Sequence, residues 1–269
     1  MSHVDLEYGK LIRKIMDKGD DIKARNGEVK RIVGHEVVFD STPLVSLRKT
    51  AWLSALREME WFMSGSNNIN DLHENVRGWW RPWENANGEI SYNYGYQFRS
   101  YQGWFDQIQF LVEGIKHHPF SRRNLVTTWN PIDMNSSGCL ITNCHGTLLQ
   151  AFIDQDDKLD LIMVQRSVDT IVGLPCNWIQ YWSLLLWLAK ETDKKIGKLH
   201  WYGMDVHLYS VHKDIILGIL ILHEDNVYQK IKTPPMEYIG KKGDKFRADN
   251  FGLLVKYDPL INLKATMVV

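Results

Sequence analysis

Two short segments carry side chains that could act together on one small molecule. The first contains Cys144 and His145, and the second is Gln165-Arg166-Ser167. A thiol, with an ordinary pKa of about 8.5, needs a nearby positive charge to become a nucleophilic thiolate at neutral pH. If the two segments pair as strands, Arg166 can supply that charge, and its guanidinium can also bind a phosphate. The pattern therefore indicates nucleophilic catalysis on a phosphorylated substrate.

Taken singly, these residues have simpler interpretations. Arg166 alone would be a surface charge, and a free buried cysteine is usually a small hydrophobic residue, the interpretation we keep for Cys139 and Cys176. Three cysteines without a paired spacing argue against a disulfide framework and a zinc site, and they favour a reducing compartment. We therefore expect no metal.

Three further polar residues lie in apolar surroundings. Asn177, near the start of an expected buried helix, can cap that helix or read the edge of a pyrimidine base. Asp169 needs a partner, either a protein group or a ligand, because an unpaired buried carboxylate is costly. Glu58 shares a helical face with Phe62 and is a candidate acid or base, although a surface glutamate is an equally good interpretation.

Other residues suit the sugar and the phosphate of a nucleotide. His207 and Tyr209 alternate along an expected strand, so both face one side and can hold a sugar hydroxyl. A core histidine and tyrosine would look the same. Arg122 and Arg123 can bind phosphate, although two adjacent arginines are more often solvated.

The composition is that of an ordinary soluble chain of 269 residues, with 44% hydrophobic residues and a formal net charge of zero. This balance gives no electrostatic reason to expect nucleic acid or a membrane as the main partner. The apolar run at 178–189 is too short to span a bilayer, and residues 1–10 carry no signal-peptide core. We therefore expect a cytoplasmic protein.

Interspersed helices and strands must position these side chains. Apolar residues at helical spacing predict helices over residues 3–18, 47–63, 105–117, 173–190 and 211–222. Strand patterns cover residues 33–39, 125–129, 147–153, 159–164 and 199–208. The order has no regular βαβ alternation, and no linker or repeat interrupts it. We therefore expect an α+β fold in a single domain over residues 1–269.

Taken together, the motifs closely resemble those of the thymidylate synthase family, from about Lys23 to the C-terminus. The segments that match in order and spacing are Glu58 with Trp61-Phe62, Asn93-Tyr94-Gly95, Ser121-Arg122-Arg123, Cys144-His145, Gln165-Arg166-Ser167 with Asp169, Gly173-Leu174-Pro175 with Asn177, and Asp205 with His207-Leu208-Tyr209-Ser210. The resemblance implies a thymidylate synthase-like α+β fold whose large mixed sheet forms the interface of a back-to-back homodimer.

The resemblance also implies roles for individual residues. A pyrimidine nucleotide such as dUMP would be held by Arg25, Gln165, Arg166, Ser167, Asn177, His207 and Tyr209, and by Arg122 and Arg123 reaching over from the other subunit. The co-substrate, 5,10-methylenetetrahydrofolate, would contact Trp80, Trp83, Asp169, Gly173 and Val269. The catalytic set would be Cys144, which adds to C6 of the base, with Arg166, His145, Glu58 and Tyr94.

The superfamily has two outcomes, which differ in the group that completes the transferred carbon. Hydride from the folate gives a methyl group in the synthases, and water gives a hydroxymethyl group in the phage nucleotide hydroxymethylases. Here Asn143 stands before Cys144 in place of a small apolar residue, and Cys176 and Trp178 replace the usual Phe and Ile beside the base-reading amide. A wetter folate pocket favours water. We therefore expect hydroxymethylation, although Trp80 suits hydride transfer.

Asn177 indicates that the base is uracil, because cytosine-specific relatives carry Asp at this position. An amide can donate to O4 of uracil and accept from N3–H, although a flipped amide could also serve cytosine. The leading interpretation is a dUMP hydroxymethylase that makes 5-hydroxymethyl-dUMP, as in phages with modified DNA, and it would then act in the host cytoplasm. The alternatives are a thymidylate synthase forming dTMP and dihydrofolate, a dCMP hydroxymethylase, and a catalytically silent nucleotide-binding relative.

Overall fold

The computed structural model describes residues 3–133 and 143–268. Its α-helices are α1 (His3–Lys18), α2 (Trp52–Ser64), α3 (Glu74–Trp80), α4 (Tyr94–Arg99), α5 (Gln107–His117), α6 (Gly173–Glu191) and α7 (Lys213–Glu224). Its strands are β1 (Asp20–Ala24), β2 (Gly27–Phe39), β3 (Leu125–Val126), β4 (Leu148–Ile153), β5 (Lys158–Asp169), β6 (Lys195–Tyr209), β7 (Met236–Tyr238) and β8 (Phe251–Leu253). Helices and strands are interspersed, which confirms the expected α+β fold.

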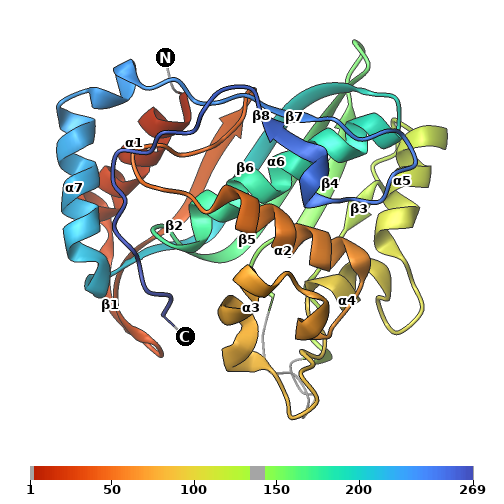
Figure 1. The fold of residues 1–269 in the computed structure, drawn as a ribbon, viewed down its shortest axis with the longest axis horizontal. Helices are drawn as coiled ribbons and strands as arrows, with labels where there is room; N and C mark the ends of the chain where they lie inside the picture. Colours follow the sequence, from red (N-terminus) through yellow and green to blue (C-terminus); the bar gives the residue numbers. More distant parts are fainter. Residues whose placement is uncertain (1–2, 134–142, 269) are drawn as a thin grey trace.

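A six-stranded mixed sheet in the order β1-β2-β6-β5-β4-β3 forms the centre of the molecule (Figure 1). β5 and β6 are parallel, whereas the other neighbouring strands are antiparallel. A parallel pair needs a crossover connection, and α6 is that connection, packed against both strands. The carboxyl ends of β5 and β6 therefore lie at the same end of the sheet, together with the first turn of α6. Asp169, Gly173 and Tyr209 lie at this end.

The core lies between the sheet and α6. Trp178 is fully buried there, and its ring meets Phe39, Trp201 and Tyr8 edge-on, with ring centres 4.9, 5.5 and 6.0 Å away. Edge-on pairs of this kind add to the stabilisation that the buried area provides. Trp178 is thus a core residue, so the interpretation that it shapes a folate pocket is wrong.

The helix expected from residue 47 begins later, at Trp52. The preceding residues are held in place by long-range bonds. The Leu47 N–H donates to Asp5 Oδ1 at 2.9 Å, and the Lys49 N–H donates to the carbonyl of Ile261 at 2.7 Å. These contacts override the helical spacing of the apolar residues, which is the only signal available in the sequence.

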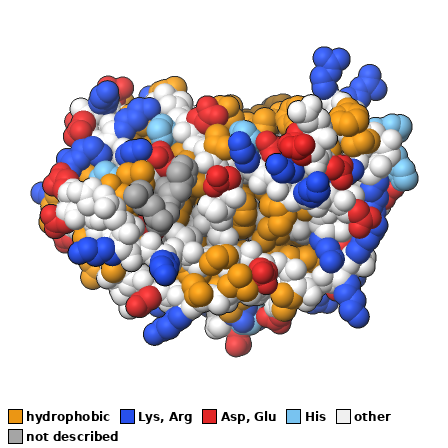
Figure 2. Space-filling view, turned by 90° about the horizontal axis from the view of Figure 1, so that it is seen from above, with side chains coloured by type: hydrophobic (Ala, Val, Ile, Leu, Met, Phe, Trp, Pro, Cys, Tyr) orange, Lys and Arg blue, Asp and Glu red, His pale blue; other side chains and the backbone are white. Residues whose placement is uncertain are grey.

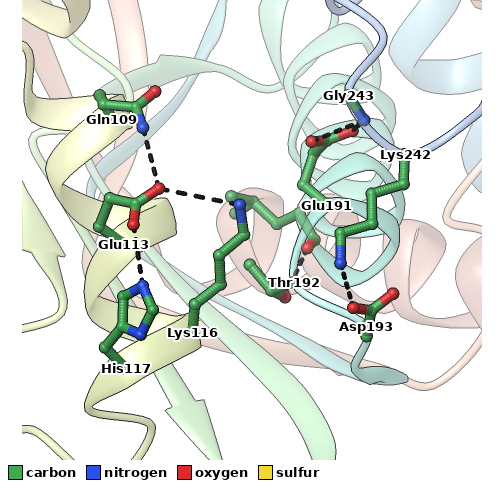
Figure 3. A network of polar contacts seen from close by, with 10 residues as sticks. Gln109, Glu113, Lys116, His117, Glu191, Thr192, Asp193, Lys242 and Gly243 are labelled. Atoms are coloured by element: carbon green, nitrogen blue, oxygen red, sulfur yellow. Dashed lines mark hydrogen bonds and ion pairs between the residues drawn. The ribbon is translucent and has the colours of Figure 1, made fainter.

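The last turn of α6 is tied to the loop that precedes β8 (Figure 3). Glu191 accepts hydrogen bonds from the Gly243 N–H at 2.8 and 3.1 Å, and Lys242 forms an ion pair with Asp193. The Glu191 hydrogen bonds and the Lys242–Asp193 ion pair anchor the C-terminal end of α6. Because a helix is stiff, they also help to hold its other end, which carries candidate site residues.

The sheet face turned away from α6 carries a row of apolar side chains beside the polar residues Gln150, Asp160 and His200. Val164 on β5 pairs with Leu148 on β4 and with Tyr202 on β6, so the three side chains form a row on this face. Phe152, Tyr202 and Met204 on the same face are 39%, 39% and 50% exposed. Exposed apolar side chains grouped in this way are typical of a protein interface.

The charged side chains form no large area of one sign on the face that Figure 2 draws, where Lys and Arg are interspersed with Asp and Glu among the described residues. Across residues 3–133 and 143–268, no helix is both long and apolar enough to cross a membrane.

Replacing the core indole tests this packing. Trp178→Ala is expected to lower the free energy of unfolding by about 3–5 kcal/mol, because it removes buried contacts and leaves a cavity. Trp104→Ala removes an indole that is 78% exposed, and it should change the free energy of unfolding by less than about 0.5 kcal/mol. Urea unfolding followed by circular dichroism measures both variants. Equal losses would contradict the placement of Trp178.

Candidate active site

The thiol of Cys144 lies against the phenol of Tyr94. Tyr94 Oη is 3.3 Å from Cys144 Sγ, and it accepts a hydrogen bond from the Cys144 backbone N–H at 2.8 Å. The hydroxyl proton of Tyr94 is therefore available to the sulfur. Tyr94 is the first residue of α4, and the side chain of Asn93 caps this helix by accepting from the Tyr96 N–H at 2.9 Å. The cap thus sets the phenol in place.

Arg166 lies beside the same cysteine, as the sequence predicted from strand pairing. Its backbone N–H donates to the carbonyl of Cys144 at 2.8 Å, and its guanidinium carbon is 5.1 Å from the ring centre of Trp129. Burial raises the pKa of the Cys144 thiol, while the hydrogen bond with Tyr94 and the positive charge of Arg166 oppose that rise. Arg166 therefore favours the thiolate, and burial favours the thiol.

His145 is buried and uncharged. Its ring stacks on Tyr94 with centres 4.0 Å apart and planes at 10°, and its Nδ1 lies 2.8 Å from Tyr181 Oη. Burial lowers the pKa of His145 to about 3, so the imidazole carries no proton to donate as a cation near neutral pH. The geometry makes His145 a support for the Tyr94 ring.

Glu58 is buried between two hydrogen-bond donors, so the interpretation as a surface glutamate is wrong. Trp80 Nε1 donates to Oε1 at 2.5 Å, and Gln180 Nε2 donates to Oε2 at 2.6 Å. Burial raises the pKa of Glu58 to about 7, and the hydrogen bonds from Trp80 and Gln180 oppose this rise. A carboxyl group that titrates near neutrality can both donate and accept a proton.

Asn177 takes part in a buried network and does not cap α6, whose N-cap is Val172. Its Oδ1 accepts from Gln165 Nε2 at 2.8 Å, and its Nδ2 donates to Gln180 Oε1 at 3.0 Å. Gln165 Oε1 in turn accepts from Trp201 Nε1 at 3.0 Å. The sequence interpretation missed Gln180 and Trp201 as site residues. A polar residue in an apolar helix, three positions after Asn177, was the available signal for Gln180.

The ends of β5 and β6 bring the expected sugar-binding and folate-binding polar residues together. His207 Nδ1 lies 2.8 Å from Asp205 Oδ1, and its ring stands perpendicular to that of Tyr209, with centres 5.1 Å apart. Asp169 Oδ1 accepts from the backbone N–H groups of Ile171 and Val172 at 2.8 and 3.2 Å. Asp169 therefore has the partner that its apolar surroundings required.

Two tryptophans form an aromatic wall beside Tyr94 and Glu58. Trp80 and Trp83 lie with ring centres 5.9 Å apart, and Trp80 also meets Tyr94 at 6.1 Å. Trp80 is buried and Trp83 is half-buried, so one end of the wall is open. Such a wall can pack against a flat ring. At Gly173 an added Cβ would meet Asn177 Oδ1 at 3.5 Å, which is an ordinary contact distance. Val269 and Cys139 lie outside the described residues.

The expected phosphate-binding arginines are divided. Arg166 belongs to the Cys144 cluster, and the Ser167 N–H donates to the Cys144 carbonyl at 3.4 Å. Arg25, Arg122 and Arg123 lie exposed in turns, and among the described residues no hydrogen bond joins them to Cys144.

A comparison with known protein families matches residues 6–269 to the family described as thymidylate synthase. The match includes every candidate residue described above. Within the described parts of the chain, no group of three or more His, Cys, Asp and Glu side chains could hold a metal ion.

The buried carboxyl group generates a test of stability against pH. Because the pKa of Glu58 is raised from 4.5 to about 7, the folded state binds a proton more tightly than the unfolded state does. Its contribution to stability is thus full below pH 4.5 and is lost as the pH rises through 7. From pH 5 to 8, the wild type should lose up to about 3 kcal/mol relative to Glu58→Gln.

Urea unfolding at fixed protein concentration measures this difference. The pH-independent effect of Glu58→Gln on its neighbours cancels, because only the change with pH is compared. Glu60→Gln removes another carboxylate of α2 and is the matched control. Parallel stability curves for the wild type and Glu58→Gln would refute the assignment of this titration to Glu58.

Proposed function

The chain belongs to the thymidylate synthase family, whose members transfer one carbon from folate to C5 of dUMP, and we propose that it acts as a dUMP hydroxymethylase. The observation that carries this proposal is Asn143. Its Nδ2 donates to the carbonyls of Tyr92 and Thr128, both at 3.2 Å, while its buried Oδ1 has no hydrogen-bond partner among the described residues. A buried unpaired acceptor calls for a donor, and a water beside Cys144 would supply it.

The proposed reaction starts at the thiol. Cys144, in its thiolate form, adds to C6 of the uracil, and the charge of Arg166 together with the Tyr94 hydroxyl favours that form. The nucleotide phosphate would be held by Arg25, Arg166 and Ser167. Addition at C6 makes C5 a carbon nucleophile, which attacks the methylene carbon that the folate supplies.

The proton steps fall to Glu58 and Tyr94. Glu58, through water, takes the C5 proton with the assistance of the Tyr94 hydroxyl, and departure of the folate nitrogen then leaves an exocyclic methylene on the pyrimidine. Water held by Asn143 then adds to this methylene, and Cys144 leaves C6. Glu58 suits proton exchange during these steps because its pKa is about 7. His207 and Tyr209 would hold the sugar 3′-hydroxyl, and Trp80, Trp83, Asp169, Gly173 and Val269 would bind the folate.

A thymidylate synthase is the second candidate. The observation that favours it is Trp80, which is only 6% exposed and joins Tyr94 and Trp83 in an aromatic wall. A dry wall of this kind protects the exocyclic methylene until the folate hydride reaches it.

The mass of the product separates the two candidates. Incubated with dUMP and 5,10-methylenetetrahydrofolate, the protein should form a nucleotide heavier than dUMP by one formaldehyde unit, without the absorbance rise of dihydrofolate. Cys144→Ala is expected to abolish this product. Asn143→Ala, which removes the proposed water ligand, should lower its yield more than it weakens dUMP binding. A product heavier by one methylene unit, with dihydrofolate, would establish the synthase instead.

We further infer a twofold homodimer built on the sheet face that is turned away from α6. The row of Leu148, Val164 and Tyr202, with Phe152 and Met204 exposed beside it, offers the kind of surface that obligate dimers bury. Among the described residues, the exposed Arg122 and Arg123 form no hydrogen bond with Cys144 of their own subunit. In a dimer they would complete the phosphate site of the other subunit, which would bind dUMP together with folate.

A charge on this face tests the dimer. Met204→Asp is expected to shift the wild-type dimer towards monomer by at least about tenfold in dissociation constant, because it would bury an unpaired carboxylate. Leu217→Asp changes a residue of α7 that is 45% exposed and should leave the dimer intact. Sedimentation velocity over a range of concentrations measures both. A monomeric wild type, or equal dissociation of the two variants, would contradict the interface.

A further inference from the structure

One continuous line of hydrogen bonds runs from the core to the buried carboxylate. Its members, in order, are Trp201, Gln165, Asn177, Gln180, Glu58 and Trp80. Each bond joins two side chains over a length between 2.5 and 3.0 Å. The candidate base reader and the candidate proton carrier are therefore connected, and Gln180 is the residue that connects them.

The direction of this line is determined at both ends. The indole N–H of Trp201 can only donate, so the oxygen of Gln165 faces it and Gln165 Nε2 faces Asn177. At the other end, Gln180 Nε2 also donates to the carbonyl of Ala55 at 3.0 Å, and a carbonyl can only accept. The amide orientation of an isolated Asn is ambiguous. Here, turning any one amide would bring two donors or two acceptors together.

The two ends together lock Asn177. Its Oδ1 points to the Gln165 side and its Nδ2 to the Gln180 side, and each atom keeps one further bonding position. A 4-oxo pyrimidine presents an acceptor at position 4 and a donor at position 3, and a 4-amino pyrimidine presents the reverse. A freely turning amide would serve both bases, whereas a locked amide matches one of them.

We propose that Gln180 is the positioning residue that locks the Asn177 amide and so makes the site distinguish 4-oxo from 4-amino pyrimidines. The inference rests on the proposed function in that Asn177 reads the base. Gln180 is fully buried in an apolar helix, and its amide is used by Asn177, Glu58 and the Ala55 carbonyl. Packing alone would be met by leucine, without the desolvation of an amide.

The decisive variant is Gln180→Leu, which keeps the apolar volume and removes all three bonds. We expect the ratio of the dissociation constants for dCMP and dUMP, measured by titration calorimetry, to fall at least about tenfold. A mismatched hydrogen-bonding pair is worth about that factor or more. The fall should come from tighter dCMP binding as well as weaker dUMP binding. Without Gln180 the Asn177 amide is held only by its bond from Gln165, so it can turn at the cost of that single bond.

A second variant separates the lock from the contact with Glu58. Gln180→Glu keeps an oxygen that accepts from Asn177 Nδ2 and loses the amide donor to Glu58. It should retain the dCMP-to-dUMP ratio within about threefold, while the midpoint assigned to Glu58 in the pH profile of kcat/KM moves to higher pH. Gln180→Leu should move this midpoint in the same direction.

Gln107→Leu is the control for the loss of a buried glutamine. Gln107 is also buried and donates to the carbonyls of Gln97 and Thr127 at 2.8 and 2.7 Å. Within the described residues, its hydrogen bonds do not reach Asn177 or Glu58. The Gln107→Leu variant should leave the dCMP-to-dUMP ratio of dissociation constants and the midpoint of the pH profile unchanged, even if it lowers the melting temperature.

The outcomes divide clearly. A folded Gln180→Leu with the wild-type ratio overturns the inference and leaves the proposed function standing. A wild type that prefers dCMP overturns the base assignment, and the lock then stands only if Gln180→Leu narrows that preference. A wild type that binds neither nucleotide overturns both.

Discussion

A buried carboxylate must be given hydrogen-bond donors, and the arrangement of the site depends on meeting that requirement at Glu58. α2 carries Glu58 inward, α3 brings the Trp80 indole to one oxygen, and α6 brings the Gln180 amide to the other. Three helices from separate parts of the chain therefore meet at one side chain. Their convergence brings Trp80 and the Asn177 network to one carboxyl group, because Trp80 and Gln180 are the two donors that Glu58 needs and Gln180 also accepts from Asn177.

The second organising contact is the aromatic stack beneath Cys144. His145 follows the cysteine in the chain and stacks on Tyr94, and the ring centre of Phe62 lies 4.7 Å from that of Tyr94. Since the imidazole is neutral, the stack holds the phenol without adding a charge near the thiol. The positive charge that favours the Cys144 thiolate then comes from Arg166, whose backbone N–H is bonded directly to the Cys144 carbonyl.

Much of this arrangement was predictable from local patterns and motif spacing. The α+β class followed from interspersed periodicities, and the proximity of Cys144 and Arg166 followed from the expectation that two neighbouring segments pair. Hydrogen-bond direction was not predictable, because it depends on Trp201 and Ala55, which lie far from Asn177 in the chain. Trp178 was misassigned for the same reason: its neighbours Phe39 and Trp201 become visible only after β2, β6 and α6 are assembled.

The carbonyl of Ala55 restricts the mutational routes by which this site could acquire a new base preference. With aspartate at position 177, the Gln180 oxygen would face a carboxylate, and relief would require the amide to turn. Its oxygen would then face the Ala55 carbonyl and Glu58, an arrangement tolerated only if Glu58 holds a proton. A single substitution at the base reader would thus disturb proton transfer at the other end of the line. Evolution towards another base would have to pass through paired changes at positions 177 and 180, so the two positions should vary together among descendants of this sequence.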